Sequence, residues 1–174
     1  MDKKLYNYSI IGFVFVGIIG SISHFVFGWS NYTTAIGCFF PVNESTWEHL
    51  KLIFFPYLIW AIAEYYLLKK EKGVLISKCI GVISGMLAVV IFFYTYTGVS
   101  GKSIGLLNIL SFFIGVGTAF LVDYFLIKSK KLSSANETIA LAVFIIIGAL
   151  FFIFTFAPPL IPLFKDPINS TYGI

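Results

Sequence analysis

Apolar residues gather into five long stretches along the chain, and short polar connectors separate them. Each stretch holds roughly 20 mainly apolar residues, the length that an α-helix needs to cross the hydrocarbon core of a bilayer. The pattern therefore predicts an all-α, polytopic bundle of about five transmembrane helices. We expect these helices at Leu5–Gly28, Leu50–Leu68, Leu75–Thr97, Ile104–Ile127 and Ile139–Ala157.

The composition agrees with an integral membrane protein. Of the 174 residues, 59% are hydrophobic and 11% are charged, whereas a soluble domain usually carries about 25% charged residues. One helical bundle uses the whole length, so we expect a single transmembrane domain over residues 1–174. The tail, residues 158–174, is rich in proline and cannot form another span. It is expected either to plug one end of the bundle or to form an extended end.

The lysines predict the orientation of the bundle. All twelve basic residues are lysines, and lysine-rich and lysine-poor connectors alternate along the chain. The positive-inside rule then places the N-terminus in the cytoplasm and the C-terminus outside. Topology explains the lysines better than nucleic-acid binding does, and the lack of arginine removes the usual bidentate phosphate clamp. We expect a multi-pass protein of a bacterial cell membrane whose surroundings are the lipid bilayer.

Small and polar residues recur every three or four positions on three of the expected helices. In lipid, such residues mark the faces where helix backbones approach closely, so the three stripes should face one another. A homo-oligomer through the same faces stays open. The stripes are Gly17, Gly20, Ser21, His24 and Gly28; Ser77, Gly81, Ser84, Gly85 and Ala88; and Asn108, Ser111, Gly115, Thr118 and Ala119. Close packing does not explain His24 or Asn108.

Residues 43–51 concentrate polar chemistry in a chain that has few charges. Glu44, Glu48 and His49 lie at the lip of the second span, and His24 lies about one turn inside the outer end of the first span. Two carboxylates and one or two imidazoles suit a divalent, zinc-like metal. We predict that His24, Glu44 and Glu48 bind this ion or position water, and that His49 moves a proton. The predicted outer site comprises His24, Asn43, Glu44, Glu48 and His49.

A structural interpretation competes with this site. Ser45-x-x-Glu48 is a capping box, which satisfies the first amides of a helix, and the pattern recurs at Ser134-x-x-Glu137. Glu48 would then be only a cap. Capping does not explain Glu44 and the two histidines together. If the helix begins before Glu44, both glutamates lie on one helical face.

Two further carboxylates, Glu64 and Asp123, lie near the cytoplasmic ends of the second and fourth spans. Each precedes a lysine, Lys69 or Lys128, by five residues. A snorkelling carboxylate paired with that lysine is the simpler interpretation. The alternative is a proton or cation relay that continues across the bundle through Asn108.

Several motifs resemble those of an uncharacterised family of small bacterial multi-span membrane proteins. They are the run Asn43–Lys51 with Phe54-Phe55-Pro56, the tripeptide Ser23-His24-Phe25, and the tail segments Pro158–Pro167 and Tyr172-Gly173. The similarity covers most of the chain. It implies a polytopic membrane protein and implies no activity.

Three classes of function fit these features, and the sequence does not decide whether the protein is an enzyme. The first is a small, metal-dependent membrane hydrolase that acts on lipid-like substrates at the outer face, where Asp166 of the tail would cover the site. The second is a substrate-binding or transport component of a small-solute importer, with Asn108 or Glu64 on the wall of a cavity. The third is a non-catalytic partner protein that docks through an apolar outer patch.

Overall fold

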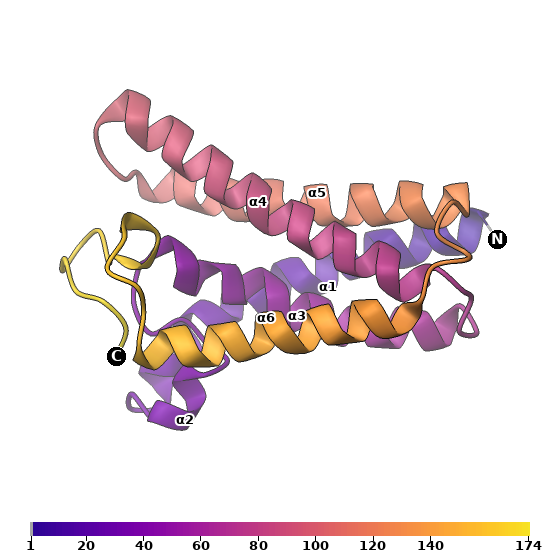
Figure 1. Ribbon diagram of the computed structural model, residues 1–174. Coiled ribbons are helices and arrows are strands. Elements are labelled where there is room, and N and C mark those ends of the chain that lie inside the picture. Colours follow the sequence, from indigo (N-terminus) through magenta and orange to yellow (C-terminus); the bar gives the residue numbers. More distant parts are fainter. Residues whose placement is uncertain (1) are drawn as a thin grey trace.

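The computed structural model describes residues 2–174 and consists of five long helices arranged side by side (Figure 1). All five are long and apolar enough to cross a membrane, so the predicted all-α bundle with five spans is confirmed. The sequence analysis did not predict the two short helices, α2 and η1. The elements are α1 (Asp2–Trp29), α2 (Thr34–Gly37), α3 (Thr46–Leu67), α4 (Val74–Ser100), α5 (Gly105–Ser129), α6 (Glu137–Phe156) and the 3-10 helix η1 (Pro162–Phe164).

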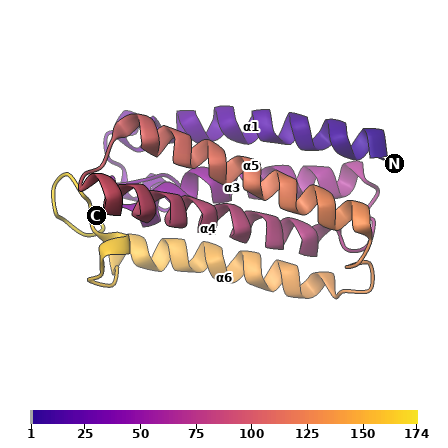
Figure 2. The same cartoon turned by 90° about the horizontal axis from the view of Figure 1, so that it is seen from above.

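Helix α3 is the centre of the bundle. It packs against α1, α4, α5 and α6 (Figures 1 and 2), and Ile53, Phe54 and Tyr57 on it are completely buried. Helix α6 packs mainly on α3 and α4 and leaves one apolar side uncovered, where Ile145 is 71% exposed. An apolar face without protein contacts is what a helix presents to lipid tails.

Glycines bring α4 and α5 into close contact, as their small-residue stripes predicted. A Cβ atom at Gly85 would lie 2.5 Å from the carbonyl oxygen of Gly115, and one at Gly81 would lie 2.7 Å from that of Ala119. The stripe on α1 packs differently. A Cβ atom at Gly20 would meet the carbonyl oxygen of Leu52 on α3 at 2.5 Å, whereas Gly28 has open space around it. The three stripes therefore do not meet along one common seam.

The caps define where α3 and α6 begin. The Ser45 side chain accepts the amide of Glu48 at 3.3 Å, so α3 begins at Thr46. Glu44 thus precedes the helix, so the condition under which both glutamates would lie on one helical face is not met. The capping box predicted at Ser134 is also wrong, because Asn136 caps α6.

Glu137 stabilises a different helix from the one in which it lies. Its carboxylate accepts the amides of Gly73 and Ile76, which belong to the first turn of α4. These amides have no partner within their own helix, and an acidic group near a helix N-terminus is electrostatically favourable. Glu137 therefore joins the start of α6 to the start of α4.

The chain termini lie at opposite ends of the bundle (Figure 1). We name the end formed by the α1–α3 connector, the α4–α5 turn and the tail the motif end. The tail folds back onto this end: Asn43 Nδ2 donates to the Gly173 carbonyl at 3.1 Å, and the Ile174 amide donates to the Thr155 carbonyl at 3.0 Å. Phe164 is buried against Trp47. The tail is thus an ordered cover over the start of α3.

Two carboxylates share one ammonium group in the half of the bundle opposite the motif end. Lys78 Nζ lies 2.5 Å from Glu64 Oε2 and 2.7 Å from Asp123 Oδ2, and all three side chains are completely buried. Tyr57 donates a hydrogen bond to Asp123, and Trp60 Nε1 donates to Glu64 at 2.8 Å. The predicted pairing of these carboxylates with Lys69 and Lys128 is wrong. Lys78 lies in the first turns of α4 and points into the bundle, whereas the other two lysines are exposed.

Replacement of Lys78 by Met should strongly destabilise the protein, because it leaves two buried carboxylates without a counter-charge. Removing one partner of a buried ion pair lowers the free energy of unfolding by about 3–5 kcal/mol. The measurement is thermal unfolding of the purified protein in detergent. Lys128→Met is the matched control and should change the unfolding temperature little. Equal effects of the two substitutions would contradict the observed pairing.

Candidate metal centre

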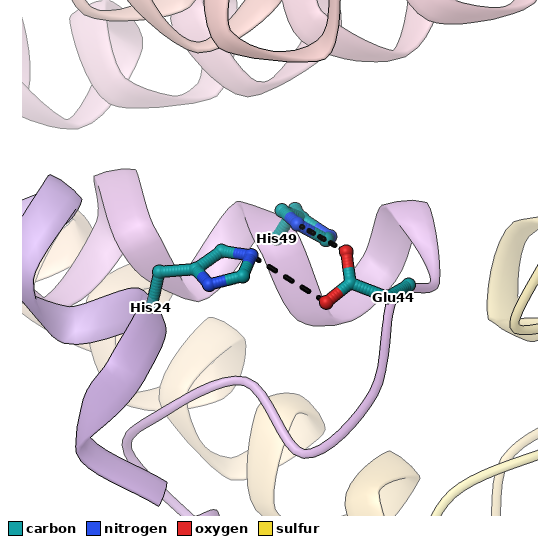
Figure 3. A group of neighbouring side chains, drawn as sticks. All are labelled: His24, Glu44 and His49. Carbon is teal, nitrogen blue, oxygen red and sulfur yellow. Dashed lines mark ion pairs between the residues drawn. The ribbon is translucent and has the colours of Figure 1, made fainter. Parts of the chain in front are cut away.

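Glu44 lies between two imidazoles that different helices contribute. His24 projects from α1, His49 from the first turn of α3, and Glu44 from the connector before α3 (Figure 3). His24 Nε2 lies 3.5 Å from Glu44 Oε1, and His49 Nε2 lies 3.4 Å from Glu44 Oε2. The two imidazole rings are 5.2 Å apart between centroids. The structure thus brings together three of the predicted site residues.

The tautomer of His49 follows from its second ring nitrogen. His49 Nδ1 lies 2.9 Å from the carbonyl oxygen of Ser45. A carbonyl only accepts hydrogen bonds, so Nδ1 carries a proton, and Nε2 is the ring nitrogen that faces the Glu44 carboxylate. When the ring is neutral, Nε2 presents a lone pair to that carboxylate. Two lone pairs that face each other repel unless a proton or a metal ion lies between them. Metal-binding histidines commonly donate their other ring N–H to a backbone carbonyl in this way.

Neighbouring residues fix the connector that carries Glu44. The Asn43 side chain accepts the amide of Ser45 at 2.9 Å and donates to the tail at Gly173. Asp166 is buried, and its Oδ2 atom accepts the amide of Glu44 at 3.4 Å. Asn43 and Asp166 therefore position the backbone of Glu44 and do not contribute side chains to the histidine–glutamate cluster.

The cluster borders a cavity of about 380 Å³ between α1, α3 and α5. Its wall is mainly apolar, and two of its members, Phe25 and Ile109, are 56% and 58% exposed on the outside of the bundle. Because that surface faces lipid in a membrane protein, the cavity opens sideways toward acyl chains. The lining residues are Ser21, His24, Phe25, Glu44, His49, Leu52, Gly105, Asn108, Ile109 and Phe112.

The sequence analysis identified Asn108 but missed the rest of the wall that α5 contributes. Asn108 lines the cavity, accepts a hydrogen bond from Tyr96 and donates to Ser103 at 3.0 Å. Gly105 and Phe112 line the same cavity one turn before and one turn after it. That spacing is the signal that could have identified them, since it places all three on one face of the helix.

Glu48, which was predicted to bind the metal and take part in catalysis, lies in a different cluster. Its Oε2 atom is 2.6 Å from Lys51 Nζ, and both side chains are almost completely buried. Lys51 also donates to the carbonyl of Gly37 at 2.8 Å and to the hydroxyl of Thr155 at 2.6 Å. Glu48 therefore joins α3 to α2 and α6 and faces away from the two histidines.

Glu64 and Asp123 also lie away from the cluster. They bind Lys78 in the opposite half of the bundle, whereas Asn108 binds residues of the α4–α5 turn. The relay from Glu64 and Asp123 through Asn108 that the sequence suggested has no hydrogen-bonded connection among the residues that the structure describes.

The electrostatics of the three ionisable clusters differ. A lysine forms the ion pairs of each of the other two, but no lysine forms an ion pair with Glu44 in the described part of the chain. The imidazole of His24, and then that of His49, holds the pKa of the Glu44 carboxyl well below its usual range, against the opposing effect of burial. The carboxylate is thus ionised and lacks a permanent cation.

The cluster has the composition and spacing of a metal-binding site. One ligand atom from each of His24, Glu44 and His49 can be chosen so that all three lie within 4.8 Å of one another. Zinc bonds to nitrogen and oxygen of about 2.0–2.2 Å imply ligand atoms about 3.3–3.6 Å apart in a tetrahedron. The His–Glu separations of 3.5 and 3.4 Å, which run to different oxygens of the carboxylate, each fall in that range and exceed those of good hydrogen bonds.

The lowered pKa of Glu44 predicts how acid affects folding. A carboxylate whose pKa is depressed in the folded state stabilises the protein above its unfolded pKa, about 4.3, and loses that contribution as the pH falls. With a chelator present, the unfolding temperatures of wild type and Glu44→Gln should differ above about pH 5, and the gap should shrink below about pH 4. Glu71→Gln, an exposed control, should show no such gap. A gap that stays constant to pH 3 would contradict the assignment.

Comparison with known proteins identifies a family but no characterised relative. No curated protein and no solved structure matches the chain. Residues 1–174 match the family described as "Family of unknown function (DUF6512)". The match extends over the two helices, the connector and the tail that build the histidine–glutamate cluster. The chain is therefore a member of the DUF6512 family, and its five apolar helices are those of a multi-pass membrane protein.

Proposed function

We propose that His24, Glu44 and His49 bind a divalent, zinc-like ion. The observation that carries this proposal is the geometry of Glu44 and His49: Nε2 of His49, the ring nitrogen that does not contact the Ser45 carbonyl, faces the Glu44 carboxylate at 3.4 Å, within the range of edge lengths of a zinc tetrahedron. Two histidines and one glutamate are the ligand set of several catalytic zinc sites, which keep the fourth position open for water or substrate. Here the three residues that would hold the ion line the cavity.

We infer that the site belongs to a membrane hydrolase for lipid-like substrates. The cavity beside the cluster is mainly apolar and opens toward lipid, which suits an acyl chain. A smaller space of about 30 Å³, lined by Glu44 and His49 among others, adjoins it and is large enough for a water molecule. A lipid chain and a water molecule thus have room on either side of the same ligands.

In the proposed reaction the chain has two roles, to hold the ion and to orient the substrate. A zinc-like ion supplies the Lewis acidity that activates water near neutral pH. The water oxygen forms the new bond to the carbonyl carbon or phosphorus, the bond to the leaving alkoxide breaks, and the proton passes to that alkoxide. His24, His49 and Glu44 hold the ion, and the walls of the cavity orient the substrate. We propose that the motif end, and hence this chemistry, lies on the outer face of a bacterial membrane, the orientation that the lysine distribution favours.

Metal analysis of the detergent-purified protein tests the site. Wild type incubated with zinc and then desalted should retain about one ion per chain. His24→Ala, His49→Ala and Glu44→Ala should each bind at least about tenfold more weakly, because each removes a ligand. The control is Glu48→Gln with Lys51→Met, which removes the neighbouring buried ion pair as a unit and should retain the metal. Equally low metal in wild type and all variants would refute the proposal.

The hydrolytic activity is tested with the zinc-loaded protein in phospholipid vesicles. Mass spectrometry of the lipids should detect cleavage products for wild type, and His49→Ala should reduce the rate to background because the ion is lost. The same Glu48→Gln, Lys51→Met control should keep the activity. If the zinc-loaded wild type releases no product, the hydrolase assignment fails, even where metal binding is confirmed.

A further inference from the structure

A second pocket at the motif end contains positive charge that the metal centre does not use. Its volume is about 490 Å³, and it lies between the α4–α5 turn and the tail. Lys102 of the turn and Lys165 of the tail both line it, with the hydroxyl-bearing residues Thr97, Ser103 and Ser170. Two ammonium groups and several hydroxyls around one pocket are the groups that bind a phosphate.

The two lysines that line this pocket form no ion pair in the described part of the chain. Only three lysines lie at the motif end, and the third, Lys51, is paired with Glu48. Across residues 2–174, no carboxylate forms an ion pair with Lys102 or Lys165. The nearby Asp166 carboxylate is occupied by the amides of residues 44, 168 and 169. Lysine is less frequent in the outer connectors of membrane proteins than in the cytoplasmic ones. Two unpaired lysines around one outer pocket therefore indicate a site for an anion.

The basic pocket and the apolar cavity are both neighbours of the small space at the metal centre. Thr46 and Phe93 line both the basic pocket and the water-sized space. Glu44 and His49 line both that space and the apolar cavity. The order is therefore an acyl-sized cavity, the histidine–glutamate cluster, and a cationic pocket. This sequence of environments matches the sequence of groups in an anionic phospholipid.

We propose that Lys102 and Lys165 bind the phosphate-bearing headgroup of an anionic phospholipid whose acyl chain occupies the cavity between α1 and α5. The inference deepens the proposed function, since it names the lipid class that would lie across the metal centre. Recognition itself does not need the metal, because the lysines and the apolar wall are independent of the three ligands. A free phosphate ion shares the headgroup chemistry, but it would leave the adjoining apolar cavity empty.

Lipid binding to the detergent-purified protein tests this proposal in the presence of a chelator. Native mass spectrometry should show phosphatidylglycerol bound about tenfold more tightly than phosphatidylcholine with the same chains, as expected for two lysines near an anionic lipid. Lys102→Gln with Lys165→Gln should abolish the preference. The control, Lys128→Gln with Lys130→Gln, removes equal charge at the opposite end and should retain it. Equal binding of the two lipids by wild type, or an equal loss in the control, would overturn the proposal.

Two further measurements distinguish lipid from free phosphate as the bound ligand, and recognition by the lysines from recognition by the metal. Inorganic phosphate, added at the same concentration as the lipid, should not displace phosphatidylglycerol. If it does, the pocket binds free phosphate and the lipid assignment is wrong. Glu44→Ala should keep the headgroup preference although it loses zinc. A preference that disappears in Glu44→Ala would contradict recognition by the lysines alone. Failure of zinc binding leaves this readout intact, so the two proposals can fail separately.

Discussion

A charged group inside a bilayer must find its partner within the protein, because the hydrocarbon offers no water. This constraint organises the ionisable residues of the bundle. Glu48 pairs with Lys51, and Glu64 and Asp123 share Lys78, in each case with the side chains almost completely buried. Glu44 is the exception, since it has only imidazoles as neighbours and borders a cavity. Of the carboxylates in these three clusters, Glu44 is thus the one without a lysine partner, and it is also the one that borders a cavity.

Much of the motif end serves to hold Glu44 in place. Helix α3 begins directly after the connector, and the backbone carbonyl of Ser45 orients His49. The tail folds back and binds the connector through Asn43 and Asp166. Ligands that are positioned by a surrounding layer of hydrogen bonds are a common feature of metal sites. The same folding of the tail brings Lys165 opposite Lys102, so the two candidate sites depend on one piece of structure.

The sequence predicted the spans because their signal is local. Twenty apolar residues specify a transmembrane helix without reference to the rest of the chain. It also predicted that His24 would lie near Glu44 and His49, since antiparallel spans place residues of equal depth together. It could not predict the partners of Glu48, Glu64 and Asp123. Periodicity defines a face of a helix but not which neighbour covers it, so it did not indicate that Lys78 of α4 points toward both Glu64 and Asp123.

X-ray absorption at the zinc edge of the zinc-loaded protein tests the central claim most directly. The account predicts one zinc ion with two imidazole nitrogens and a carboxylate oxygen at about 2.0–2.2 Å, and the loss of one imidazole from the spectrum in His24→Ala. A zinc ion with no imidazole ligands, or a spectrum that His24→Ala leaves unchanged, would contradict it.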